Sequence, residues 1–151
     1  MSKGTLGLAG GVILALLLFA GCGSSSGDEP LTHAEFLKQG NAICKKRNDE
    51  REKTISEALG KLAAEKKKTV VPDEKKKILL EIIPFFEQGT EELKELEAPE
   101  KDEEKVEAII EAREKAAQET RDDLDKFINS RDQYKVPNEL STEFGLERCY
   151  Q

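Results

Sequence analysis

Residues 78–96 read ILLEIIPFFEQGTEELKEL, and this stretch indicates the fold class more clearly than any other. Its apolar and small residues alternate at spacings of three and four: Leu79, Ile82, Phe86, Gly89, Leu93 and Leu96. A helix with 3.6 residues per turn gathers these positions on one face, where they can pack against another helix in a coiled-coil-like seam. Pro84 lies inside the pattern and should bend the helix or open it locally. The stretch predicts a helix from about Pro72 to Ala98.

A longer helix is predicted before this one. Thr32 and Glu35 have the spacing of a capping box, in which each side chain satisfies an otherwise unpaired backbone N–H at a helix start. Apolar or small residues then recur with helical periodicity, with Arg47 and Arg51 in the middle turns of the stripe. This helix should run to about Lys67, because the Val-Pro pair that follows it forces extended backbone.

Two more helices are predicted after the central stretch. A long one is expected from about Glu100 to Arg131, with acidic residues in its first turns, where the helix dipole favours them. A short one begins near Val136 and ends at Gly145, a suitable C-terminal stop. We therefore expect an all-α fold over residues 32–151. Its form should be an antiparallel three-helix bundle with a short C-terminal helical segment, stapled by one disulfide.

The composition excludes several classes of function. The chain has 151 residues, 36% of them charged and 5% aromatic, with a net charge of -7. That length suits one domain. His33 is the only histidine, and neither a catalytic triad, a Gly-rich phosphate loop, an EF-hand nor the Glu-x-x-His pairs of di-iron bundles is present. We therefore expect no catalysis, no metal, no cofactor and no nucleic-acid partner.

The first residues are typical of an export signal. Lys3 is followed by an apolar stretch over residues 6–21, which is shorter than the roughly 20 residues needed to span a bilayer. The sequence LFAGC at residues 18–22 resembles the bacterial lipobox, whose Cys receives diacylglycerol on sulfur. This resemblance implies a signal peptide at residues 1–21 and lipidation of Cys22. The alternative is a plain secreted protein in which Cys22 is an incidental thiol.

Residues 22–31 are polar and rich in Ser and Gly, so we expect a flexible tether between the lipid and the folded part. The predicted location is the bacterial cell membrane, lipid-anchored and facing the extracytoplasmic side. If Cys22 carries lipid, Cys44 and Cys149 are an even pair in an oxidising compartment, which predicts one disulfide. Two buried free thiols are the alternative.

A family resemblance supports the anchor and the cysteine pair. The lipobox, the tether, the ICKKRN segment at residues 43–48 and the FGLERC ending at residues 144–149 together resemble a group of small actinobacterial lipoproteins. The similarity covers the two ends of the chain. It implies no particular chemistry.

Two groups of lysines flank the first predicted turn, while acidic runs flank the second. In a bundle these turns lie at opposite ends, so a basic tip is predicted to point away from the membrane toward an envelope protein or an anionic cell-wall polymer. The lysines of this basic tip are Lys66, Lys67, Lys68, Lys75, Lys76 and Lys77. The alternative is that they complement a helix dipole and keep the turn soluble. The function expected is binding or scaffolding at the bacterial envelope.

A second hypothesis concerns polar residues of the first helix near Cys44. Asn41, Arg47, Asn48 and Arg51 could line a small-ligand pocket, which would make the protein an extracytoplasmic carrier. The alternative is that they hydrogen-bond the C-terminal segment as it approaches Cys149.

Overall fold

The computed structural model describes residues 30–65 and 69–149. The elements, in chain order, are α1 (His33–Ala64), α2 (Pro72–Lys94), α3 (Glu103–Asp122), α4 (Leu124–Asn129), the 3-10 turn η1 (Asp132–Tyr134) and α5 (Lys135–Phe144). The prediction of an all-α fold is confirmed. The predicted signal peptide, Cys22, nearly all of the tether, and Lys66 to Lys68 lie outside the described residues.

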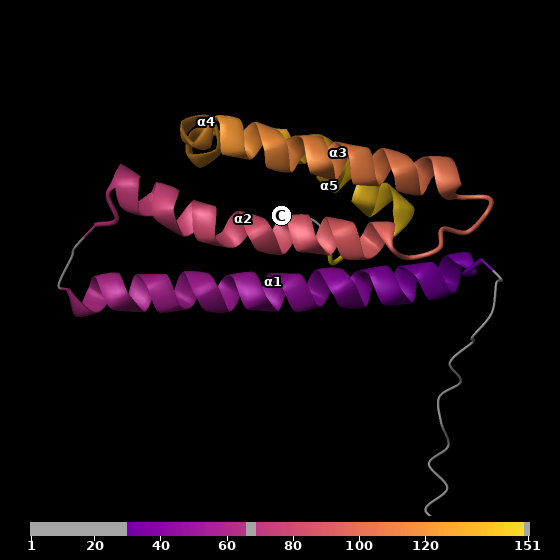
Figure 1. Cartoon of the computed structure of the whole chain (residues 1–151), viewed down its shortest axis with the longest axis horizontal. Helices are drawn as coiled ribbons and strands as arrows, with labels where there is room; N and C mark the ends of the chain where they lie inside the picture. The colour runs from indigo at the N-terminus through magenta and orange to yellow at the C-terminus, as the bar shows by residue number, and fades with distance from the viewer. Residues whose placement is uncertain (1–29, 66–68, 150–151) are drawn as a thin grey trace, which may run out of the picture.

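The helices are arranged around α2. It packs against α1 on one side and against α3 on the other, and α3 also packs against α5. Figure 1 shows α1, α2 and α3 extended along the long axis of the molecule, with α5 behind them. None of the described helices combines the length and the apolar character needed to cross a membrane.

The start of α1 follows from its sequence. The Thr32 hydroxyl accepts a hydrogen bond from the Glu35 amide at 3.3 Å, and the Glu35 carboxylate accepts one from the Thr32 amide at 3.0 Å, which confirms the capping box. α1 ends at Ala64, somewhat before the predicted Lys67, whereas α2 begins at Pro72 as predicted and holds Pro84 within its length. It ends at Lys94.

The predicted continuous helix over residues 100–131 is wrong. α3 ends at Asp122, and Asp123 adopts φ -142° and ψ 81°, which is not helical. The Asp123 carboxylate accepts a hydrogen bond from the Lys126 amide at 2.8 Å and so caps the new helix α4. An Asp in this position competes with helix continuation, because its side chain satisfies a backbone donor at a fresh helix start.

The core joins the two ends of the described chain. Its larger cluster of buried residues comprises Phe36, Cys44, Leu93, Val106, Ile109, Phe144, Leu146 and Cys149. A second cluster holds Phe86, Ala116, Ala117 and Tyr134. Gly145 ends α5 with φ 99°, a left-handed conformation that favours glycine, as predicted. The chain then turns back to α1, where Cys149 forms the predicted disulfide with Cys44.

Candidate functional site around the disulfide

The polar residues predicted on α1 surround the disulfide but do different things. Asn41 donates to the Gly145 carbonyl at 3.1 Å and accepts from the Arg148 amide at 2.8 Å. Asn48 donates to the Arg148 carbonyl at 2.7 Å. Both amides therefore hold the backbone of the C-terminal segment against α1, which corresponds to the packing alternative for these two residues.

Arg47 connects α1 to α2. Its guanidinium donates to the carboxylate of Glu92 and, at 2.7 Å, to that of Glu50. The hydrogen bond with Glu92 raises the pKa of Arg47, and the same bond lowers the pKa of the Glu92 carboxyl below its ordinary value. Both side chains of the Arg47–Glu92 pair are only partly exposed, so water screens this inter-helix ion pair less than a fully solvated one.

This ion pair predicts an acid-sensitive contribution to stability. The folded-state pKa of Glu92 lies below its ordinary value of 4.5, so the unfolded chain binds more protons as the pH falls through that range. The stabilisation is present above about pH 5 and is lost on acidification. Glu92→Gln should lower the free energy of unfolding at pH 7 by about 1 kcal/mol and flatten its fall between pH 5 and 3.

Urea unfolding followed by circular dichroism at several pH values measures this. Glu91→Gln is the matched control, because Glu91 is its exposed neighbour and makes no ion pair with another described residue. Equal pH profiles for the two variants would contradict the assignment.

Arg113 was missed by the sequence analysis and is the most unusual residue of the site. It belongs to α3 and is 2% exposed. Its Nε donates to the Thr90 hydroxyl at 3.0 Å and its Nη1 to the Cys149 carbonyl at 2.7 Å, while its Cζ lies 4.2 Å from the centre of the Phe86 ring. No carboxylate within residues 30–65 and 69–149 pairs with it, and burial lowers its pKa to about 10.

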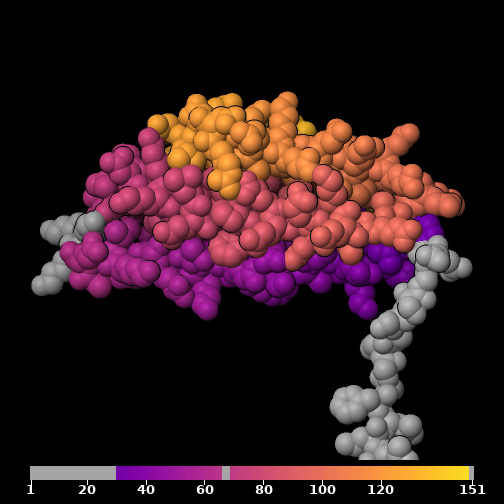
Figure 2. Space-filling view, viewed as in Figure 1, coloured from indigo at the N-terminus to yellow at the C-terminus, as the bar shows by residue number. Residues whose placement is uncertain are grey.

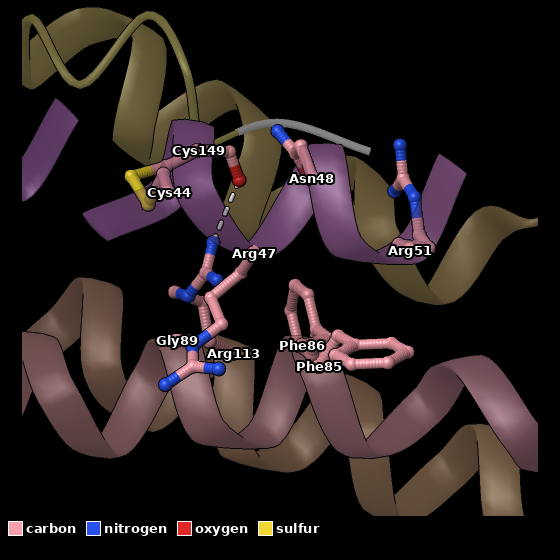
Figure 3. Close-up of a pocket in the computed structure, with 9 residues that line it drawn as sticks. All are labelled: Cys44, Arg47, Asn48, Arg51, Phe85, Phe86, Gly89, Arg113 and Cys149. Atoms are coloured by element: carbon pink, nitrogen blue, oxygen red, sulfur yellow. Dashed lines mark hydrogen bonds between the residues drawn. A yellow bond between two sulfur atoms is a disulfide. The ribbon is translucent and has the colours of Figure 1, made fainter. Parts of the chain in front are cut away.

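A sequence signal for Arg113 exists. Position 113 lies four residues after Ile109 and three before Ala116, on the apolar stripe of the third predicted helix. A charged residue on that stripe must either be exposed or be buried with partners. Figure 3 shows that it reaches between the helices toward the Cys149 carbonyl.

The space enclosed by these residues is very small. Three arginines, the disulfide and Phe86 border a cavity of about 10 Å³. This is about the room that one water molecule needs. An organic ligand does not fit here, so the geometry favours packing over a carrier site at this position.

The remaining candidates lie at the ends of the molecule. Lys75 and Lys77 are exposed at the start of α2, whereas the Lys76 ammonium lies 2.7 Å from the Asp125 carboxylate of α4. Lys76 is therefore partly engaged within the fold. At the other end, His33 is half-exposed and its Nδ1 lies 2.8 Å from the Asp102 carboxylate.

In the described part of the chain, no three His, Cys, Asp or Glu side chains are grouped so that they could hold a metal ion. Comparisons of the chain with protein-family models, with curated proteins and with solved structures give no match.

Proposed function

We propose that this chain is a lipid-anchored protein on the extracytoplasmic face of a bacterial cell membrane, where it binds or scaffolds an envelope partner and performs no catalysis. The observation that carries the proposal is the length of α1. Its 32 residues correspond to about 48 Å, and Figure 2 shows that its indigo start and magenta end lie at opposite ends of the molecule. A partner that binds the far end is therefore held well away from the anchor.

The charges support this orientation. The side-chain contact between His33 and Asp102 keeps the acidic connection between α2 and α3 beside the tether end of α1. Anionic lipid headgroups repel such a surface, whereas Lys75 and Lys77 lie at the opposite end. The basic tip, to which the sequence also assigns Lys66, Lys67 and Lys68, is then directed toward an anionic cell-wall polymer or an acidic protein.

The finer architecture, an antiparallel three-helix bundle, is part of the proposal. Two contacts between α2 and α3 support opposite directions, because Glu87 pairs with Arg121 while Lys94, further along α2, pairs with the earlier Glu114. The two contacts of α1 with the α2 side agree with the same pattern, since Arg47 pairs with Glu92 while the start of α1 meets Asp102.

The basic tip is tested by replacing five of its lysines with Gln: Lys66, Lys67, Lys68, Lys75 and Lys77. Lys76 is left in place because of its pairing with Asp125. The variant should show severalfold weaker retention on isolated cell walls at low ionic strength, where exposed charges interact most strongly. The difference in retention between this variant and the wild type should disappear in high salt.

A control variant removes the same number of exposed lysines from outside the basic tip: Lys38, Lys45, Lys53, Lys105 and Lys115. It changes the net charge by the same amount as the first variant. It should keep wild-type retention, because the basic tip is intact. If both variants are retained equally, the lysines serve only solubility and the tip is not an interaction site.

The anchor is tested by the intact mass of the membrane-extracted protein, alkylated with and without reduction. Cleavage before Cys22 with a mass increment of acyl size is the expected result. Two alkylation sites should appear only after reduction, at Cys44 and Cys149. An unlipidated chain would overturn the proposed location.

A further inference from the structure

A larger pocket lies away from the disulfide, toward the α4 end of the molecule. Its volume is about 410 Å³, and it is bordered by α1, α2, α4, η1 and the start of α5. This size falls in the range of small-molecule sites. The pocket exists because the chain breaks at Asp123 and turns back through η1, so that Phe127 and Tyr134 face the side of α2.

The floor of this pocket is apolar. It consists of Leu79, Ile83, Phe86 and Tyr134, each at most 5% exposed. The Tyr134 ring packs edge-on against Phe86, and its hydroxyl lies 3.4 Å from the Thr120 hydroxyl on α3. The floor therefore suits a group without hydrogen-bonding atoms, such as a hydrocarbon chain.

The mouth of the pocket is positively charged. Arg131 and Lys135 line it, both exposed, and neither forms an ion pair with another of the residues that the structure describes. Asp132 supplies the one carboxylate among the described residues that line the pocket. The mouth thus attracts an anionic group.

Arg131 is also held in an unusual backbone conformation. Its φ of 55° is the only positive φ outside glycine in the described residues. This left-handed region is costly for a residue with a Cβ, and such residues concentrate at functional sites. The conformation places the Arg131 Cζ 5.7 Å from the centre of the Phe127 ring, at the edge of the pocket.

We propose that this pocket binds a single-chain amphiphile, with its hydrocarbon chain on the floor and its carboxylate at Arg131 and Lys135. A long-chain fatty acid has this chemistry. The pocket volume of about 410 Å³ lies toward the lower end of the range of small-ligand sites, so we expect one hydrocarbon chain and not two. The inference goes beyond the proposed envelope binding and does not depend on it.

The test uses the full chain in detergent-free phosphatidylcholine vesicles and a 16-carbon fatty acid that carries a photoreactive diazirine and an alkyne. After illumination, the label should map to peptides containing Phe86, Phe127 or Tyr134. Hexadecanoate should displace the probe at concentrations at least tenfold lower than hexadecanol, which lacks the charge. Butyrate, which lacks the chain, should not compete.

Two variants separate binding from folding. Arg131→Gly should reduce labelling at least fivefold without lowering the thermal midpoint, because glycine adopts φ 55° at no steric cost. Ile82→Trp should abolish labelling by filling the pocket. Lys126→Gln, an exposed charge on α4 outside the pocket, is the control and should label normally.

Label spread along the whole chain, equal displacement by hexadecanol, or unchanged labelling of both Arg131→Gly and Ile82→Trp would each overturn the proposal. Equal displacement by hexadecanol, together with crosslinks between chains, would show that a partner protein occupies the pocket in place of an amphiphile. The basic-tip experiment is read out on cell walls, so the two proposals fail independently.

Discussion

Serine at both Cys44 and Cys149 is expected to lower the free energy of unfolding by about 4–5 kcal/mol. The disulfide joins residues 105 apart, so it removes a large amount of conformational entropy from the unfolded chain. In the chain-entropy model a loop of this length is worth close to 5 kcal/mol. Domains of this size have total stabilities of about 5–15 kcal/mol, so the change is a large fraction of the whole.

Urea unfolding measures this effect through both the midpoint and the slope. The slope should rise in the double variant, because the unfolded chain without a crosslink exposes more surface. The hydrogen bonds from Asn41 and Asn48 to the C-terminal segment remain, so the variant should still be helical below its transition. Reductant should destabilise the wild type equally and leave the variant unchanged. A loss below 1 kcal/mol would show that the crosslink stores little stability.

The helices that could be predicted from the sequence are those with a local signal at each boundary. Thr32 with Glu35 starts α1, Pro72 starts α2 and Gly145 ends α5. Each acts through its own backbone and its near neighbours, so the sequence alone determines the outcome. The cysteine pair could also be predicted, since the argument from compartment and even number does not require the fold.

The break at Asp123 could not be predicted from periodicity. Leu124 and Phe127 continue the apolar stripe of the third predicted helix in phase, so the pattern gave no sign of an interruption. The interruption comes from a capping hydrogen bond of one side chain. The 410 Å³ pocket depends on this break, so the periodicity of the sequence could not indicate a pocket beside Phe127.

Part of the candidate site around the disulfide could be predicted from the sequence, and Arg113 could not. The positions of Asn41 and Asn48 on the stripe of α1 predict that they lie near the C-terminal segment, and both donate hydrogen bonds to its backbone. Arg113 was overlooked because a lone arginine among apolar residues is usually solvent-exposed. Its partners, Thr90 and the Cys149 carbonyl, come from distant parts of the chain and only the fold brings them together.

Arg113→Ala should lower the free energy of unfolding by about 3–5 kcal/mol, whereas Arg113→Met should cost less than half as much. The alanine variant leaves a cavity in the core, with a penalty of about 2–5 kcal/mol, and also leaves the Cys149 carbonyl without its donor, at about 1–3 kcal/mol. Methionine fills most of the volume, so the cavity contribution largely disappears.

The methionine variant separates the cavity from the loss of the charge, because alanine and methionine both remove the guanidinium. A pKa lowered to about 10 means that burial disfavours the guanidinium charge by about 3 kcal/mol. Removing that charge offsets the loss of the hydrogen bond and of the contact with the Phe86 ring, which is worth about 2 kcal/mol when desolvated. Urea unfolding at pH 7 compares the variants. If methionine is as damaging as alanine, the cavity contributes little and the lost hydrogen bond to the Cys149 carbonyl dominates the cost.

A double-mutant cycle then links the two largest effects. Arg113 donates to the carbonyl of the same residue whose sulfur forms the disulfide, so the two interactions share Cys149. If the crosslink holds this carbonyl in place, Arg113→Met should cost at least 0.5 kcal/mol less in the Cys44→Ser, Cys149→Ser background, which is about the smallest coupling such cycles resolve. Additive effects would show instead that Asn41 and Asn48 position the C-terminal segment without help from the disulfide. In that case the disulfide acts on the unfolded chain alone, and Arg113 is the residue that makes the packing of this end specific.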